Sequence, residues 1–130
     1  MKHKMVLRHI VDFLMTANLL ALMAYVLMGQ AVHDHVKKNG YSVVEDVGGH
    51  GVGLEFHEDP FVSYVTKRGT EMVMAPGMIF TIEPMVNMGT SEIYVDDSNG
   101  WTIYTEDGKP SAQWEIMVLV TEAGHEVLAW

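Results

Sequence analysis

A long apolar run lies near the start of the chain, and shorter apolar segments follow it. Residues 13–32, FLMTANLLALMAYVLMGQAV, carry no charge and come after a basic start, MKHKMVLRH. About 20 apolar residues can span a bilayer, and a basic start before an apolar run is also typical of a signal peptide. Leu, Met and Ala equally favour a buried helix, and Asp12, Asn18 and Gln30 argue against a membrane position. We expect a helix in a soluble core, with a signal or a membrane anchor through residues 10–29 as alternatives.

A second, shorter helix is predicted over residues 30–38, QAVHDHVKK. Ala31, Val32 and Val36 are expected to face inward, and the two valines, four residues apart, share one face of the helix. Two lysines complement the negative end of the helix dipole, and Gly40 suits the left-handed conformation that ends many helices. The helix is therefore expected to stop at Asn39-Gly40.

Later apolar segments are separated by turn signals such as APG, SNG and DGKP. The glycine-rich stretch that follows residues 41–47 is expected to be a loop. Helices followed by strands with short connections indicate an α+β fold with a mainly antiparallel sheet. We divide the chain into an apolar helical segment, 1–28, and a second part, 29–130. The strands are expected at residues 41–47, 78–86, 100–107 and 111–121.

Composition limits the chemistry. The net charge is −9, which argues against a nucleic-acid partner because binding to phosphates needs a basic surface. The chain has no cysteine, so any metal ion would have to be held by His, Asp and Glu. The lack of cysteine also agrees with a cytoplasmic location.

Two carboxylates interrupt segments that otherwise predict buried strands. Glu83 lies in FTIEPMV and Glu115 in AQWEIMVLV. An ionised carboxylate in apolar surroundings costs several kcal/mol unless a cation or hydrogen-bond donors compensate it. Either residue could instead point to the solvent face of its strand.

A histidine-containing stretch, GHGVGLEFHEDP, precedes both carboxylates. Glycines on both sides of His50 let the backbone pass close to a neighbouring group. Taken alone, His50 or His57 could be an ordinary structural residue. One histidine with two glutamates would suit a divalent ion such as Mn, Fe, Co or Zn, and His57 would then be free to act as an acid or a hydrogen-bond donor.

Other polar groups have simpler interpretations. Asp96-Asp97 and Glu106-Asp107 lie beside turn residues and are expected to form turns. The chain contains no GxSxG, P-loop or HExxH motif.

Three segments stand out between about Gly29 and Val127: GYSVVEDVGGHGVGLEFHEDP, PGMIFTIEPMVNMGT and GWTIYTEDGKPSAQWEIMVLVTEAGHEVL. In order and spacing they resemble the C-terminal half of bacterial type I methionine aminopeptidases. TIEPMVNMGT and SAQWE favour this family over its creatinase and prolidase relatives. The resemblance implies half of a pita-bread fold and a metal-dependent hydrolase that removes the N-terminal methionine from nascent proteins.

The resemblance also implies roles for individual residues. His50 and Glu83 correspond to ligands of one metal ion, and Glu115 to the carboxylate that bridges two ions. Co, Mn, Fe or Zn could fill such a site. Glu83 also corresponds to the group that carries a proton in catalysis.

Substrate contacts are implied in the same way. His57 corresponds to the catalytic residue that meets the scissile amide, and Phe56 and Trp114 would help to line the methionine pocket. The implied partner is a peptide or nascent protein with an initiator methionine.

The family completes its metal centre with two aspartates, and residues 1–28 contain only Asp12. We therefore expect a truncated chain that is impaired or inactive alone. The alternative is a non-catalytic half-domain that acts as an interaction module or a membrane-associated remnant. Self-association through the uncovered half of the fold is a further expectation.

Overall fold

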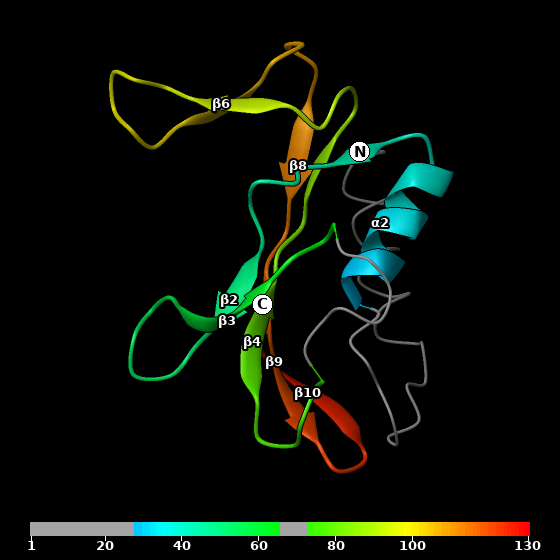
Figure 1. The fold of residues 1–130 in the computed structure, drawn as a ribbon, viewed down its shortest axis with the longest axis vertical. Coiled ribbons are helices and arrows are strands. Elements are labelled where there is room, and N and C mark those ends of the chain that lie inside the picture. The colour runs from blue at the N-terminus through cyan, green and yellow to red at the C-terminus, as the bar shows by residue number, and fades with distance from the viewer. Residues whose placement is uncertain (1–27, 66–72) are drawn as a thin grey trace.

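The structure, a computed structural model, describes residues 28–65 and 73–130 (Figure 1). The apolar helix expected in residues 1–28 lies outside this part of the chain, except for its last residue, and the domain division at residue 28 stays a prediction. Within the two described ranges, no helix is long and apolar enough to cross a membrane.

The predicted short helix is confirmed as α2, Met28–Lys38. Val32 and Val36 are both fully buried, as their spacing indicates. Gly40 has a φ of 79°, and its N–H bonds the carbonyl of Lys37 at 3.0 Å, while the N–H of Tyr41 bonds Val36 at 3.2 Å. This pair of bonds is a Schellman motif, so the left-handed glycine ends the helix at the expected place.

Ten strands follow in the described residues, and they are short. They pair antiparallel in every case and form a five-stranded sheet in the order β10-β9-β4-β2-β3, a three-stranded sheet β1-β5-β8 and a hairpin β6-β7. The predicted α+β fold with a mainly antiparallel sheet is confirmed. The strands are β1 Ser42–Val43, β2 Gly49–Gly51, β3 Glu58–Val62, β4 Ile79–Ile82, β5 Met85–Asn87, β6 Ile93–Val95, β7 Ile103–Thr105, β8 Ser111–Gln113, β9 Ile116–Thr121 and β10 Gly124–Ala129.

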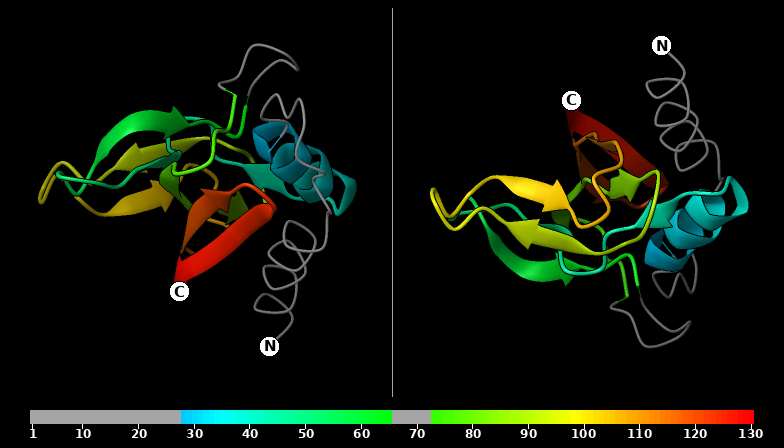
Figure 2. Two further views of the ribbon diagram at one scale, coloured as in Figure 1. Left: turned by 90° about the horizontal axis from the view of Figure 1, so that it is seen from below. Right: turned by 90° about the horizontal axis from the view of Figure 1, so that it is seen from above.

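The core lies where the helix meets the sheets. Val32 and Val36 of α2 share one hydrophobic cluster with Phe80, Ile116 and Val118 from the central strands β4 and β9. Both views in Figure 2 show α2 on one side of the strands and the β6-β7 hairpin extending away from it. The helix therefore supports the central strands and leaves the hairpin outside the main core.

Two segments that were expected to be single strands are each divided. Residues 78–86 form β4 and the start of β5, and residues 111–121 form β8 and β9, with each half in a different sheet. Residues 41–47 and 100–107 contain only the short strands β1 and β7. Strands β3, β6 and β10 were not predicted.

The expected glycine-rich loop around His50 was wrong, because Gly49–Gly51 forms strand β2 between β3 and β4. A Cβ on Gly49 would lie 2.1 Å from the carbonyl oxygen of Thr81, and one on Gly51 would lie 2.1 Å from that of Asp59. The glycines are needed because neighbouring strands come so close. Pro60 lies inside the edge strand β3, where a missing N–H is tolerated.

Candidate metal centre

The two carboxylates lie at a break shared by both pairs of central strands. On one side of the break the last residue of β4, Ile82, pairs with the first residue of β9, Ile116. On the other side the first residue of β5, Met85, pairs with the last residue of β8, Gln113. Both pairs belong to one antiparallel register, with two residues on each strand between them. Carried across the break, this register sets Glu83 opposite Glu115.

The backbone around Glu83 explains the break. Pro84 follows it and has no N–H to give to a ladder. The N–H of Glu83 bonds instead to the phenol oxygen of Tyr64 at 2.7 Å. Burial is the largest of the causes that raise the pKa of Tyr64 far above its ordinary value, so this buried phenol stays neutral.

His50 reaches the same place from the neighbouring strand β2. The pairing of β2 with β3 shifts between His50 and Gly51, which is a bulge-like irregularity. Irregularities of this kind redirect a side chain and are common next to functional sites. The shift therefore accounts for the way in which His50 projects from a very short strand.

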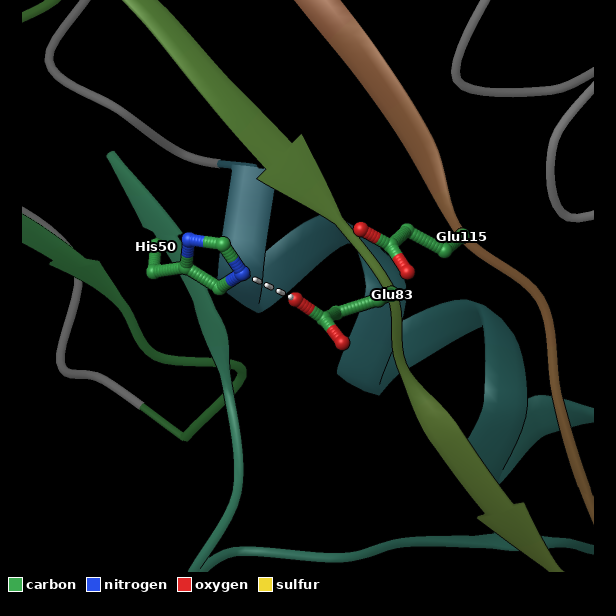
Figure 3. Close-up of side chains that lie close together, drawn as sticks. All are labelled: His50, Glu83 and Glu115. Carbon is green, nitrogen blue, oxygen red and sulfur yellow. Dashed lines mark ion pairs between the residues drawn. The ribbon is translucent and has the colours of Figure 1, made fainter. Parts of the chain in front are cut away.

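The ring of His50 is fixed by a local contact. Its Nδ1 lies 2.9 Å from the carbonyl oxygen of Gly51. A carbonyl can only accept, so Nδ1 carries the proton of this hydrogen bond. In the neutral ring, Nε2 then carries a lone pair, and it points at Oε1 of Glu83 over 3.3 Å (Figure 3). Two acceptors at this distance favour a cation between them.

Together His50, Glu83 and Glu115 offer ligand atoms that all lie within 4.8 Å of one another (Figure 3). His50 and Glu83 are each 14% exposed, whereas Glu115 is exposed. Within the described parts of the chain this is the one group of three such residues. One imidazole and two carboxylates fit a divalent transition metal, so the three residues could hold such an ion.

Sequence reasoning missed two residues that hold the Glu83 carboxylate. The hydroxyl of Thr81 donates to Oε1 at 2.7 Å, and the side-chain amide of Gln113 donates to Oε2 at 3.3 Å. Thr81 precedes Glu83 by two positions, and Gln113 precedes Glu115 by two. Alternation along a strand puts such pairs on one face, so that spacing was the available signal.

His57 and Phe56 lie beside the cluster, on its exposed side. The His57 ring meets the His50 ring edge to face with centroids 4.3 Å apart, and Phe56 lies 5.9 Å from His50 and 4.6 Å from His57. Phe56 is 76% exposed and Trp114 is 47% exposed. The structure therefore brings His57 and Phe56 to the cluster, and Trp114 immediately precedes Glu115, while their roles stay predictions.

Fold and site together define a candidate metal centre built on antiparallel strands. The chain belongs to metallopeptidase family M24, whose model matches residues 17–122. The proteins of this family are metallopeptidases, which agrees with a site for a divalent ion in this chain.

Individual relatives agree with the family. The chain is 48% identical over 101 residues to a methionine aminopeptidase of Chlamydia pneumoniae, covering 78% of this chain and 34% of that protein. Its structure is similar to methionine aminopeptidases from Thermotoga maritima, with a TM-score of 0.86 over 95% of this chain and 49% of that chain, and from Rickettsia prowazekii, with 0.84 over 97% and 52%. Each solved structure is 34% identical in sequence.

The predicted resemblance to methionine aminopeptidases is confirmed, and the chain has the architecture of half of a pita-bread fold. It spans about a third of the length of the Chlamydia relative and about half of each solved structure.

Proposed function

We propose that this chain supplies the metal-binding part of an aminopeptidase that removes an N-terminal methionine from peptides and nascent proteins. The observation that carries the proposal is the meeting of His50, Glu83 and Glu115, whose ligand atoms lie within 4.8 Å of one another. The similarity to methionine aminopeptidases supports the substrate.

His50 and Glu83 would hold one ion, and Glu115 would reach this ion and a second one. Mn, Fe, Co and Zn all accept a nitrogen ligand together with carboxylates. A bound divalent ion would polarise the carbonyl of the substrate and make a water molecule more acidic.

The chain's own residues would handle protons and substrate. Glu83 is held at both oxygens, by Thr81 and by Gln113, so its carboxylate has a fixed direction in which to take up and release a proton. The exposed His57 would donate a hydrogen bond to the amide that is cleaved. Phe56 and Trp114 would contact the methionine side chain through their exposed rings.

A substrate with an initiator methionine arises on nascent proteins, so the proposed location is the cytoplasm. Self-association and membrane association stay predictions.

The test is a titration of the metal-free full chain with Co(II) under anaerobic conditions, followed by visible absorption. Glu115→Ala is compared with Glu126→Ala, which changes an exposed glutamate of β10. We expect wild type and Glu126→Ala to bind Co(II), and Glu115→Ala to bind much more weakly. A wild-type chain that binds no Co(II) would contradict the proposed metal site.

Hydrolysis is measured separately on a Met-Ala-Ser peptide with the Co(II)-loaded chain. Release of free methionine that depends on Glu115 supports the proposed reaction. His57→Ala should keep Co(II) binding and lose roughly 10²–10⁴-fold in rate, the usual contribution of a general acid or base. Tight Co(II) binding without methionine release would agree with a chain that supplies the metal-binding part and is inactive alone.

A further inference from the structure

Thr81 lies between two of the proposed metal ligands without being one itself. It belongs to β4, and its side chain is almost fully buried, with 1% exposed. Its hydroxyl oxygen accepts the backbone N–H of His50 at 2.9 Å and lies 2.7 Å from Oε1 of Glu83. One buried hydroxyl therefore contacts both ligand residues.

The direction of each hydrogen bond is fixed by what its partner can do. The backbone N–H of His50 can only donate, so the Thr81 oxygen accepts it with a lone pair. An ionised carboxylate can only accept, so the single hydroxyl proton goes to Glu83. The carbonyl of His50 is a much poorer acceptor for this proton, because it lies 3.5 Å away.

The close approach of β2 to β4 is what allows this double contact. A Cβ on Gly49 would lie 2.1 Å from the Thr81 carbonyl oxygen and 3.2 Å from its hydroxyl oxygen. The absence of a side chain at Gly49 lets the two strands lie at the distance at which one hydroxyl reaches both His50 and Glu83.

We propose that Thr81 is a positioning residue, whose hydroxyl orients Glu83 and holds the His50 backbone so that their ligand atoms face each other before a metal ion binds. This inference rests on the proposed metal site. Hydrogen bonds to the ligands of a metal fix their orientation, and their loss typically weakens metal binding by about 10- to 100-fold.

The experiment measures Co(II) binding to the chain by visible absorption, for wild type, for three substitutions of Thr81 and for one control substitution. Thr81→Val keeps the branched shape of the side chain and removes its hydroxyl. Thr81→Ser and Thr81→Ala both remove the methyl group and differ from each other only in the hydroxyl. Thr105→Val is the control, since it removes a hydroxyl bonded to the Lys109 carbonyl in the β6-β7 hairpin.

We expect Thr81→Val to raise the dissociation constant for Co(II) by about 10- to 100-fold. Thr105→Val should leave it unchanged. If Thr81→Val does not fold, the Ser and Ala pair carries the test, and Thr81→Ser should bind more tightly than Thr81→Ala. The Co(II) absorption spectrum at saturation should also change when the hydroxyl is lost, which a loss of stability alone would not cause.

Two results would overturn the positioning role while leaving the metal site intact. One is wild-type affinity and an unchanged spectrum in Thr81→Val, and the other is equal affinity in Thr81→Ser and Thr81→Ala. Failure of the wild-type chain to bind Co(II) would instead overturn the proposed function on which the inference rests.

Discussion

Glu83 and Glu115 face each other across the break between two pairs of antiparallel strands. The pairs on either side, Ile82 with Ile116 and Met85 with Gln113, keep one register across the break. Like charges directly opposite each other destabilise a pair of strands. A cation between these carboxylates would remove this cost, so the strand pairing itself favours a metal ion at this point.

Glu115→Gln should therefore have opposite effects on stability with and without metal. In EDTA the variant should be more stable than wild type by roughly 0.2–1 kcal/mol, because a like-charge pair is removed. With Mn(II) at about 100 times the dissociation constant, wild type should gain about 2.7 kcal/mol and the variant much less. Urea unfolding in the two buffers measures both differences.

Glu126→Gln is the matched control for this crossover, since it removes one charge from an exposed position of β10. The difference in the free energy of unfolding between Glu126→Gln and wild type should be the same in EDTA and in Mn(II). A Glu115→Gln variant that is less stable than wild type in EDTA would contradict the unfavourable pairing.

The residues that meet at the candidate site could be picked out from the sequence because they contrast with their neighbours. Glu83 and Glu115 interrupt apolar segments, and His50 lies between glycines. The contacts of Thr81 and Tyr64 could not be found in this way. They depend on the distance between strands that are far apart in the chain, and a buried threonine or tyrosine is ordinary in a strand.

The strands were harder to predict than the helix. Helix α2 has local signals, an apolar spacing of four and a glycine stop, whereas β2 consists of Gly49, His50 and Gly51, which have little intrinsic preference for a strand. It is a strand only because β3 and β4 pair with it. The division of residues 78–86 has a local signal, because Pro84 has no N–H to give to a ladder, whereas residues 111–121 contain no such signal and are divided only by the strands with which their halves pair.

Gly49→Ala should be strongly destabilising, and Gly53→Ala should be much milder. The new Cβ at position 49 would meet the Thr81 backbone, which cannot move without separating β2 from β4. At position 53 it would meet the carboxylate end of Glu58, a flexible side chain that can turn away. Overpacking of the first kind costs typically about 1–3 kcal/mol, so urea unfolding should separate the two variants. Equal losses of stability in Gly49→Ala and Gly53→Ala would contradict the close approach of β2 and β4.

The turn that follows β7 should contribute a pH-dependent part of the stability through Asp107. Hydrogen bonds from the backbone N–H of Lys109, and next from that of Thr90, lower the pKa of Asp107 below its ordinary value of 3.8. A lowered pKa in the folded state stabilises the fold above pH 3.8, and this stabilisation is lost as the pH falls through the lowered value.

Asp107→Asn should accordingly have a lower melting temperature than wild type at pH 6, and the difference between the two melting temperatures should become smaller as the pH is lowered below about 4. Thermal unfolding at several pH values gives the comparison, with the adjacent substitution Glu106→Gln as its control. A gap that stays constant or widens toward low pH would show that the Asp107 carboxylate is not stabilised in the folded state.

Tyr64→Phe removes the acceptor of the Glu83 N–H and should affect both stability and metal binding. The phenol oxygen is 2.7 Å from this N–H, and Tyr64 is 1% exposed, so no solvent would replace the lost bond. Leaving a buried donor without a partner costs about 1–3 kcal/mol, which urea unfolding of the metal-free chain would detect. Tyr41→Phe is the control, since Tyr41 also packs against the core and immediately follows the Gly40 that ends α2.

The same variant distinguishes two ways in which the break between the strands could be maintained. If the Tyr64 hydroxyl holds Glu83 out of the ladder, Tyr64→Phe should weaken Co(II) binding as well as stability, because the carboxylate loses its fixed backbone. If Pro84 alone maintains the break, the stability should fall and the dissociation constant for Co(II) should stay at the wild-type value. The loss of stability and the change in the dissociation constant for Co(II), measured on one preparation, would show whether the phenol of Tyr64 or Pro84 maintains the break.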